Sequence, residues 1–225
     1  MTDTLTRQDS GPVTTSDGGC EYVSRVHNSK TSKDLQDIYD KWADQFNDDI
    51  AKQDYVAPKY VAEAILDNLG KVDGDILDAG CGTGLSGIAL AQVGCKNIDG
   101  VDLSTGMLKV AAKTGLYRSL APADLSKPIE KQDDTYDVVT CVGTLTHGHV
   151  DPKPALEEFI RITKPGGLIV ATIIDDIWAT HGYEAEVKRL QDAGLAEVLS
   201  TESKAYRQNA GVYAKILVLR KRIGS

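Results

Sequence analysis

The residues with the clearest chemical meaning form a glycine-rich stretch. Gly80, Gly82, Gly84 and Gly87 follow the short apolar run 76–79. Glycine permits a tight turn, and it lets backbone N–H groups approach a ligand closely. A plain strand-to-helix turn would need one glycine rather than four. The spacing therefore predicts a loop that holds a cofactor between a strand and a helix.

Two classes of cofactor use such a loop, and the neighbouring acids distinguish them. Residues 82–87 satisfy the GxGxxG dinucleotide fingerprint, and Asp102 follows at about the distance of a ribose-binding acid. Asp78, however, stands two residues before Gly80, where a pyrophosphate would meet a negative charge. A sulfonium cofactor that ends in an ammonium group is favoured there. We therefore expect S-adenosylmethionine as the cofactor, with an NAD(P)-dependent oxidoreductase as the weaker alternative.

Two histidines are the candidate catalytic bases. His147 and His149 follow the apolar run 136–142. Doubly wound sheets bind ligands in the crevice outside the carboxyl ends of their strands, and imidazole is the usual base near neutral pH. We predict that both histidines are catalytic. The alternative, that they cap a loop or face solvent, stays open because orientation alone can supply much of the rate of an in-line methyl transfer.

The elements that must position these residues form an α/β pattern. Short apolar or β-branched runs alternate with helical stretches, which is typical of βαβ units. The chain predicts a Rossmann-like doubly wound seven-stranded sheet, mostly parallel, with a C-terminal antiparallel hairpin. The expected strands are 76–79, 97–101, 117–122, 136–142, 168–174, 197–207 and 212–219. The expected helices of this part are 86–93, 105–114, 154–163 and 184–193.

The part before the sheet divides into a tail and two helices. Residues 1–29 are rich in Thr, Ser, Asp and Gly, so we expect a disordered tail. Apolar residues recur at helical spacing from Ser32 to Ile50, and Pro58 opens a second helix that closes at Gly70. The length suits one domain, which we place at residues 30–225.

The pattern Asp78-x-Gly80-x-Gly82-x-Gly84 resembles motif I of the class I S-adenosylmethionine-dependent methyltransferases. Segments 38–43, 100–108 and 142–147 are most similar to the methyltransferase-like family named for the Williams-Beuren syndrome chromosome region. The resemblance covers about residues 32–222. It implies the strand order 3-2-1-4-5-7-6 and S-adenosylhomocysteine as the product. It also implies a helical lid (30–70) over a Rossmann-like core (71–225).

The resemblance also implies roles for particular residues. The glycine loop passes under the methionine part of the cofactor, Asp102 binds both ribose hydroxyls, and Asp124 lies near the adenine amino group. Leu103 and Met107 flank the purine. The predicted cofactor-binding residues are Tyr39, Tyr55, Asp78, Gly80, Cys81, Gly82, Asp102, Leu103, Met107, Ala123, Asp124, Leu125 and Cys141. For Tyr39 the alternative is a purely structural aromatic stripe with Trp42 and Phe46.

Composition and missing motifs narrow the partners. A net charge of -8 disfavours nucleic acid, because phosphate binding depends on Lys and Arg. No apolar run is long enough for a membrane span, and the N-terminus lacks a secretory signal, which predicts a cytoplasmic protein. The four cysteines form no CxxC pair and have no nearby histidine at ligand spacing, so we expect no metal.

The acceptor is argued by elimination. Gly143 to Thr146 replace the Asn/Asp-Pro-Pro-aromatic motif of amino-methyltransferases, and no paired-glutamate loop of arginine methyltransferases follows the fourth strand. A small-molecule acceptor remains, in a monomer or homodimer. Two alternatives on the same fold stay open: a non-methylating, cofactor-bound enzyme of the isomerase type, and an interaction protein.

Overall fold

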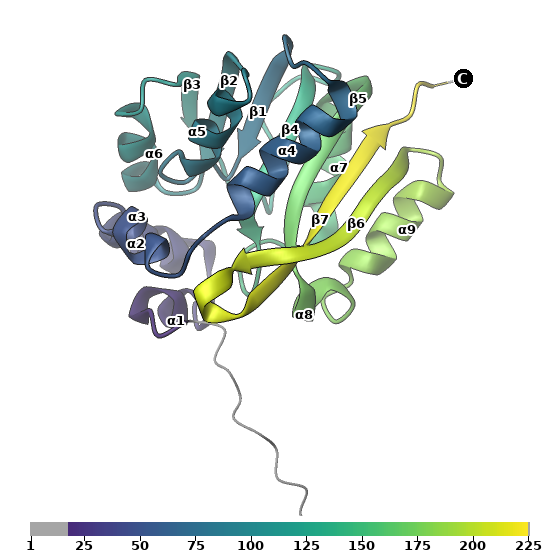
Figure 1. Cartoon of the computed structure of the whole chain (residues 1–225). Helices are drawn as coiled ribbons and strands as arrows, with labels where there is room; N and C mark the ends of the chain where they lie inside the picture. Colours follow the sequence, from purple (N-terminus) through teal and green to yellow (C-terminus); the bar gives the residue numbers. More distant parts are fainter. Residues whose placement is uncertain (1–17, 225) are drawn as a thin grey trace, which may run out of the picture.

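The computed structural model describes residues 18–224 and contains one seven-stranded sheet (Figure 1). The strand order β3-β2-β1-β4-β5-β7-β6 confirms the predicted fold and topology. Strands β1 to β5 pair in parallel, and β7 runs antiparallel between β5 and β6. The strands are β1 (Asp75–Ala79), β2 (Asn97–Asp102), β3 (Tyr117–Pro122), β4 (Tyr136–Leu145), β5 (Thr163–Ile174), β6 (Ala196–Arg207) and β7 (Val212–Lys221).

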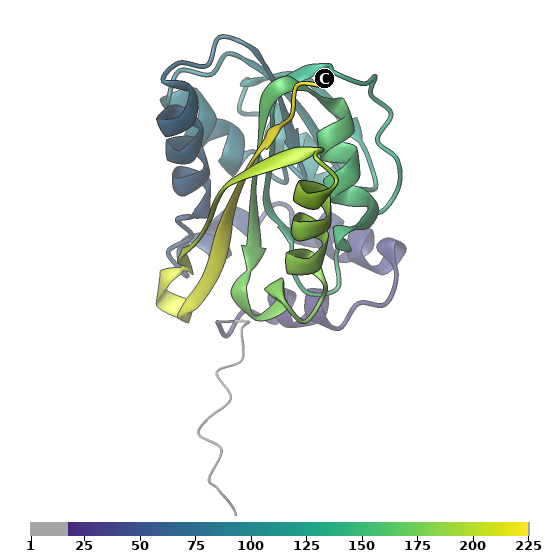
Figure 2. The same ribbon diagram turned by 90° about the vertical axis from the view of Figure 1, so that its right-hand side faces the viewer.

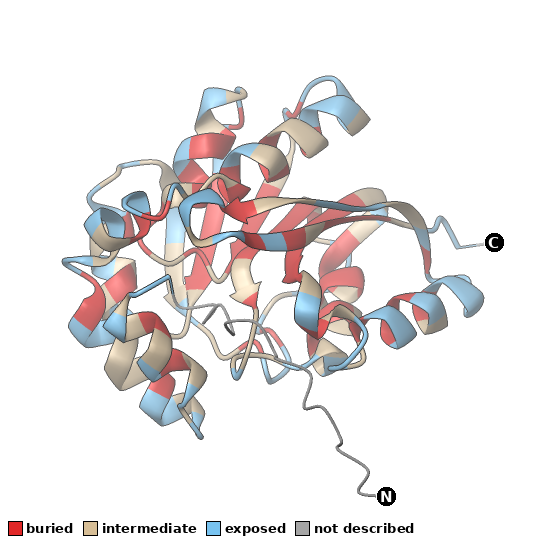
Figure 3. Cartoon of the chain, turned by 60° about the horizontal axis from the view of Figure 1, so that its bottom comes forward, coloured by how far each residue is buried: buried red, intermediate tan, exposed pale blue. Residues whose placement is uncertain are grey.

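Helices cover both faces of the sheet. Helices α4 and α5 contact each other on one face, and α7 and α9 contact each other on the other (Figures 1 and 2). The central strands are therefore shielded on both sides, which is why most residues of β1, β4 and β5 are buried (Figure 3). The helices of this part are α4 (Ala57–Leu69), α5 (Leu85–Gln92), α6 (Thr105–Ala112), α7 (Pro152–Ile162), α8 (Asp175–Trp178) and α9 (Tyr183–Asp192).

Three helices precede α4 and lie across the carboxyl ends of the strands, at the lower edge of the sheet in Figure 1. They are α1 (Glu21–His27), α2 (Ser32–Trp42) and α3 (Phe46–Ala51). The single helix expected from Ser32 to Ile50 is therefore wrong, because the chain leaves the helix between Trp42 and Phe46 and forms two.

The predicted tail is corrected at its C-terminal end. Val23 and Val26 of α1 are buried, and the Tyr22 ring stacks on Trp42 with centroids 5.1 Å apart. This tertiary packing compensates the ordering entropy that the local sequence alone does not offset. Residues 18–29 thus belong to the folded part, while residues 1–17 of the expected tail lie outside the described residues.

The C-terminal hairpin is tied to the segment between α3 and α4. Tyr55 forms an antiparallel bridge with Arg207, and the Val56 N–H donates to the Tyr206 carbonyl at 3.2 Å. The Gln208 N–H donates to the Asp54 carbonyl at 3.1 Å. These backbone bonds hold the end of β6 against the N-terminal part of the molecule. Across residues 18–224, none of the helices has the length and apolar character of a membrane span.

Candidate functional site

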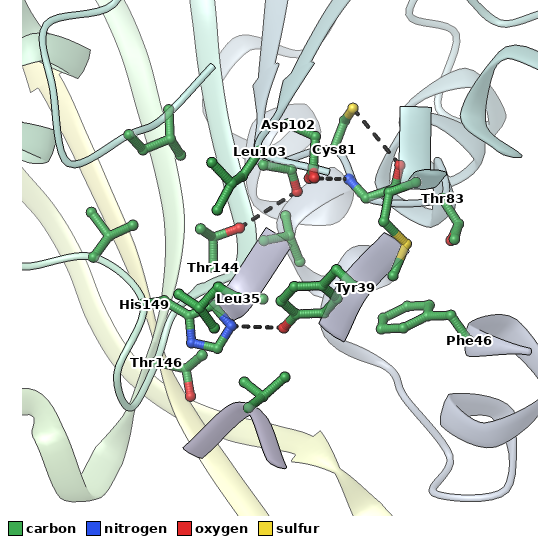
Figure 4. A pocket seen from close by; sticks show the side chains of 18 of the residues that line it. Leu35, Tyr39, Phe46, Cys81, Thr83, Asp102, Leu103, Thr144, Thr146 and His149 are labelled. Carbon is green, nitrogen blue, oxygen red and sulfur yellow. Dashed lines mark hydrogen bonds between the residues drawn. The ribbon is translucent and has the colours of Figure 1, made fainter. Parts of the chain in front are cut away.

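A pocket lies at the carboxyl ends of the parallel strands, under α1, α2 and α3 (Figure 4). Its floor comes from the loop after β1 and from the ends of β2 and β4. The segment after β3 and the end of β6 complete the wall. The sheet topology therefore brings together side chains that the sequence separates by more than a hundred residues, as expected for a doubly wound sheet.

The glycine loop forms the part of the floor next to β1. Gly80 and Gly82 have positive φ angles of 76° and 52°, a region that side chains other than glycine rarely adopt. A Cβ on Gly80 would stand 2.0 Å from Thr144 Oγ1, so the loop and the end of β4 approach too closely for any larger residue. The N–H groups of Gly80 and Cys81 donate to the Val101 carbonyl at 2.7 and 3.0 Å, which fixes the loop on β2.

Asp102 ends β2 beside this loop. One carboxylate oxygen accepts the Gly82 N–H at 2.8 Å, and the other accepts the Ser104 N–H at 2.9 Å. Burial raises the pKa of Asp102 to about 6, and the two backbone donors only partly offset that rise. The carboxylate lines the pocket, so it can accept further hydrogen bonds from a vicinal diol.

Asp78 and Cys141 lie beneath the pocket rather than in its lining. The fully buried Asp78 carboxylate accepts the Tyr117 hydroxyl at 2.7 Å and the Thr140 hydroxyl at 3.1 Å. Burial raises its pKa to about 6. Cys141 is fully buried in β4. These two side chains do not reach the pocket, so the structure does not support the direct ligand contacts predicted for them. Asp78 instead connects β1 to β3 and β4.

Tyr39 and His149 meet inside the pocket (Figure 4). The Tyr39 hydroxyl lies 2.7 Å from His149 Nε2, and His149 Nδ1 lies 2.8 Å from the His147 carbonyl. A carbonyl can only accept, so Nδ1 carries the proton, and Nε2 accepts from the tyrosine. Burial lowers the pKa of His149 to about 4 and raises that of Tyr39. The pair is therefore neutral, and the tyrosine hydroxyl is bound to the basic nitrogen.

His147 lies outside the pocket lining. Its Nε2 pairs with Asp176 Oδ2 at 3.2 Å, and its ring lies 5.1 Å from the His27 ring and 5.9 Å from the His181 ring, between centroids. His147 thus connects His27, which lines the pocket, with His181, which does not. His147 contributes its carbonyl to the site by orienting His149, which differs from the side-chain role predicted for it.

The other predicted residues line the pocket as expected from the topology, and several further residues join them. Asp124 accepts from Lys127 Nζ at 2.9 Å and from the Ser126 hydroxyl at 2.5 Å. The remaining predicted residues in the lining are Tyr55, Cys81, Leu103, Met107, Ala123 and Leu125. Lining residues that sequence reasoning missed include Thr83, Thr144, Tyr206 and Arg207.

The helices above the pocket are held to the cofactor loops by polar contacts. The Thr83 hydroxyl donates to Asn47 Oδ1 at 2.5 Å. Asp40 Oδ1 accepts the Ser104 hydroxyl at 2.5 Å and the Gly106 N–H at 2.7 Å, so α2 caps the start of α6. No local pattern indicated these contacts, because they depend on how α2 and α3 pack on the core. Among the described residues, no group of His, Cys, Asp and Glu side chains has the geometry of a metal site.

Comparison with known proteins gives this geometry its context. A family model described as a methyltransferase domain matches residues 76–167. Methyltransferase-like protein 27 of Homo sapiens is 36% identical over 168 residues, which are 72% of this chain and 68% of that protein. Demethylmenaquinone methyltransferase of Streptomyces avermitilis is 32% identical over 195 residues, covering 85% of this chain and 80% of the relative.

Other relatives match over a shorter stretch. The ubiquinone biosynthesis O-methyltransferase of Bordetella avium is 35% identical over 98 residues, so the chain spans 40% of that enzyme's length. Among solved structures, the [4+2]-cyclase SpnF has a TM-score of 0.65 at 19% identity, covering 87% of this chain and 98% of the other. That similarity shows the fold alone.

Two relatives above 30% identity, each covered over more than two thirds of its length, carry methyltransferase names, and the matched family model spans the glycine loop. The chain therefore belongs to the family of class I S-adenosylmethionine-dependent methyltransferases.

Proposed function

We propose that the protein transfers a methyl group from S-adenosylmethionine to the hydroxyl of a small molecule. The observation that carries this proposal is the single pocket that joins the glycine loop, Asp102 and the Tyr39–His149 pair. The cofactor, when bound, supplies an electrophilic methyl group. The chain must hold it, orient an acceptor, exclude water and receive a proton.

The residues present fit the cofactor. Gly80 and Gly82 present backbone without side chains on the pocket floor, and the methionine part would lie there. Asp102 would accept the two ribose hydroxyls, and Asp124 would accept the adenine amino group. Leu103 and Met107 would supply the apolar contacts to the purine. Both acids already lie in the pocket wall, so these contacts require no rearrangement of the strands.

The Tyr39–His149 pair suits a proton relay. As the acceptor oxygen bonds to carbon, its proton would pass to Tyr39 Oη, while Tyr39 passes its own proton to His149 Nε2. An alcohol oxygen that has begun to bond to a methyl group is a far stronger acid than a free alcohol, so a base with a pKa of about 4 is sufficient. A protonated amine would lack this advantage before attack, which favours a hydroxyl acceptor.

The relatives' names support a small acceptor. Several are ubiquinone biosynthesis O-methyltransferases, and one is a demethylmenaquinone methyltransferase. The position of α2 and α3 over the pocket supports residues 30–70 as a lid on the core 71–225, within a single domain. The same proposal includes membership of the subfamily named for the Williams-Beuren syndrome chromosome region. It also includes a cytoplasmic location, a monomeric or homodimeric state, and no nucleic-acid partner.

A second candidate is a non-methylating enzyme of the same fold. One solved structure of this fold carries the name of a [4+2]-cyclase, so the fold also occurs in a protein named for another reaction. Fold does not fix chemistry, so this alternative must be tested by its product. Methyl transfer releases S-adenosylhomocysteine in proportion to product, whereas a cyclase or isomerase releases none.

The first test is calorimetric titration with S-adenosylmethionine, S-adenosylhomocysteine and NADH. We expect micromolar binding of the first two and none of NADH. Incubation with methyl-labelled cofactor and a panel of phenols, catechols and matching anilines should then transfer label to the oxygen compounds. Binding of NADH alone would refute the cofactor assignment, and transfer to the anilines alone would refute the hydroxyl acceptor.

A further inference from the structure

The end of β6 places two consecutive side chains in the same pocket. Neighbouring residues of a regular strand point to opposite faces of the sheet. Tyr206 and Arg207 are nevertheless both buried, and both line the pocket. The register of β6 on β7 shifts between Ala205 and Arg207. Such an irregularity, common beside active sites, redirects a side chain that the regular pleat would turn away.

Arg207 is held firmly at this position. Its backbone bridges Tyr55, and its Nη1 donates to Gln53 Oε1 at 2.8 Å. The guanidinium carbon lies 5.8 Å from the centroid of the Tyr206 ring. A fixed guanidinium loses little freedom when it binds a planar anion, because its fork of donors matches a carboxylate.

Two hydroxyls accompany this cation. The Tyr55 and Tyr206 rings meet edge to face, with centroids 5.1 Å apart. A Cβ placed on Gly143 would lie 2.7 Å from the Tyr55 hydroxyl and 3.2 Å from that of Tyr206, so both oxygens reach the end of β4. The Tyr55 and Tyr206 hydroxyls are hydrogen-bonded to each other. The pocket lining thus contains the acceptor side chains Asp102 and Asp124, and it contains side chains with donor groups at Arg207, Tyr206 and Tyr55.

We infer that Arg207, Tyr206 and Tyr55 form a carboxylate-binding subsite in the pocket. This inference rests on the proposed function. The carboxylate comes either from the methionine end of the cofactor or from an acidic acceptor. Either carboxylate would bind to the same guanidinium and hydroxyls, and an experiment can distinguish the two sources.

The test compares paired ligands that differ by one carboxylate. Calorimetry measures S-adenosylmethionine against its decarboxylated form, and then benzoate against benzamide on the S-adenosylhomocysteine complex. The variants are Arg207→Gln and Arg207→Lys, and Tyr206→Phe removes one hydroxyl. Lys204→Gln is the matched control, since it removes a cation from the same strand whose Nζ lies over the Tyr60 ring, outside the pocket lining.

In the wild type we expect one of the two carboxylate ligands to bind at least tenfold more tightly than its neutral partner. Arg207→Gln should abolish that preference, Arg207→Lys and Tyr206→Phe should reduce it, and Lys204→Gln should keep it. A preference for the intact cofactor assigns the subsite to methionine, and a preference for benzoate assigns it to the acceptor.

If the wild type binds S-adenosylmethionine but shows neither preference, the subsite is refuted while the proposed function stands. This comparison needs no variant, so a misfolded Arg207→Gln protein leaves it intact. A preference that Arg207→Gln retains in a folded protein also refutes the subsite. If the wild type binds no S-adenosylmethionine, the proposed function fails, and the inference fails with it.

Discussion

At the scale of single residues, Asp102 couples cofactor binding to pH. Its carboxylate must be ionised to accept two ribose hydroxyls, and its pKa in the free protein is about 6. Affinity for S-adenosylmethionine should therefore rise between pH 5 and pH 7 and level off above. Asp102→Asn should weaken binding by about 10- to 100-fold, the range for hydrogen bonds to a charged group, and should flatten the rise.

Calorimetry between pH 5 and pH 8 checks this prediction. Asp78→Asn is the matched control, because Asp78 has a similarly raised pKa but does not line the pocket. That variant should keep the rise. An Asp102→Asn protein that binds as tightly as the wild type, with the same pH profile, would show that Asp102 is not the ribose acid.

The Tyr39–His149 pair makes a separate prediction about turnover. Tyr39→Phe keeps the ring but removes the hydroxyl that lies 2.7 Å from His149 Nε2. If this hydroxyl relays the proton, kcat should fall by about 100-fold or more, in line with general acid–base catalysis, while cofactor affinity changes little. Steady-state kinetics and calorimetry on one preparation measure both quantities.

The control for Tyr39 is Tyr22→Phe. Tyr22 stacks on Trp42 but does not itself line the pocket, so this variant removes a hydroxyl that lies outside the site. It should retain full kcat. Equal loss of kcat and of cofactor affinity in Tyr39→Phe would instead assign Tyr39 a structural role in the lid.

At the scale of elements, the sequence predicts what local pattern determines. Strand β3 was predicted with its observed bounds, and the glycines of the loop after β1 were placed between a strand and a helix. Contacts set by packing were not predictable. Helix α1 depends on the burial of Val23 and Val26. Arg207 lies at a register shift in β6 that the periodicity of the sequence does not predict.

Within the site, the same distinction separates residues that were found from those that were missed. Asp102 follows a strand in a recognisable motif, so its place is fixed by the sheet. His147 and His149 were equivalent in sequence, but the turn after β4 puts one ring into the pocket and the other beside Asp176. Which of two nearby side chains faces a ligand depends on the loop's path.

Asp40 provides a prediction about how elements are joined. Its carboxylate accepts from Ser104 and from the Gly106 N–H, so α2 is fastened to the N-terminus of α6, where a negative charge is favourable. Asp40→Ala should destabilise the protein by about 1 to 2 kcal/mol, as for loss of a helix cap, and should weaken cofactor binding by loosening α2.

Urea denaturation and calorimetry measure these two effects of Asp40→Ala. Asp40→Asn keeps an acceptor oxygen and should recover most of the loss. Asp37→Ala is the control on the same helix. Asp37 forms a solvent-exposed ion pair with Lys33, so this variant should change neither quantity. Wild-type affinity in a destabilised Asp40→Ala would show that α2 does not shape the pocket.

At the scale of the whole molecule, buried titratable groups change the free energy of unfolding in opposite directions over the same pH range. The folded Asp78 carboxyl keeps its proton up to about pH 6, whereas an unfolded aspartate releases it near 3.8. The folded state thus binds more protons between these values, and stability falls as pH rises through them. A shift of this size corresponds to roughly 3 kcal/mol.

His149 acts in the opposite direction. Its imidazole stays neutral in the folded state down to about pH 4, whereas an unfolded histidine takes up a proton near pH 6.5. The unfolded state binds more protons between these values, so stability falls as pH falls through them. Asp102, whose pKa burial also raises to about 6, acts in the same direction as Asp78. The pH dependence of stability on the acid side is therefore the difference between the contribution of these two carboxyls and the opposite contribution of His149.

Two variants separate these contributions in the whole protein. Urea denaturation at pH values from 4 to 7.5 gives the free energy of unfolding of the wild type, Asp78→Asn and His149→Gln. Relative to the wild type, Asp78→Asn should gain stability as pH rises from about 4 to 6, because the cost of ionising the buried carboxyl is gone. His149→Gln should gain stability as pH falls from 6.5 to 4. Profiles parallel to the wild type in both variants would mean that these groups titrate alike in the folded and unfolded states, and the prediction would be wrong.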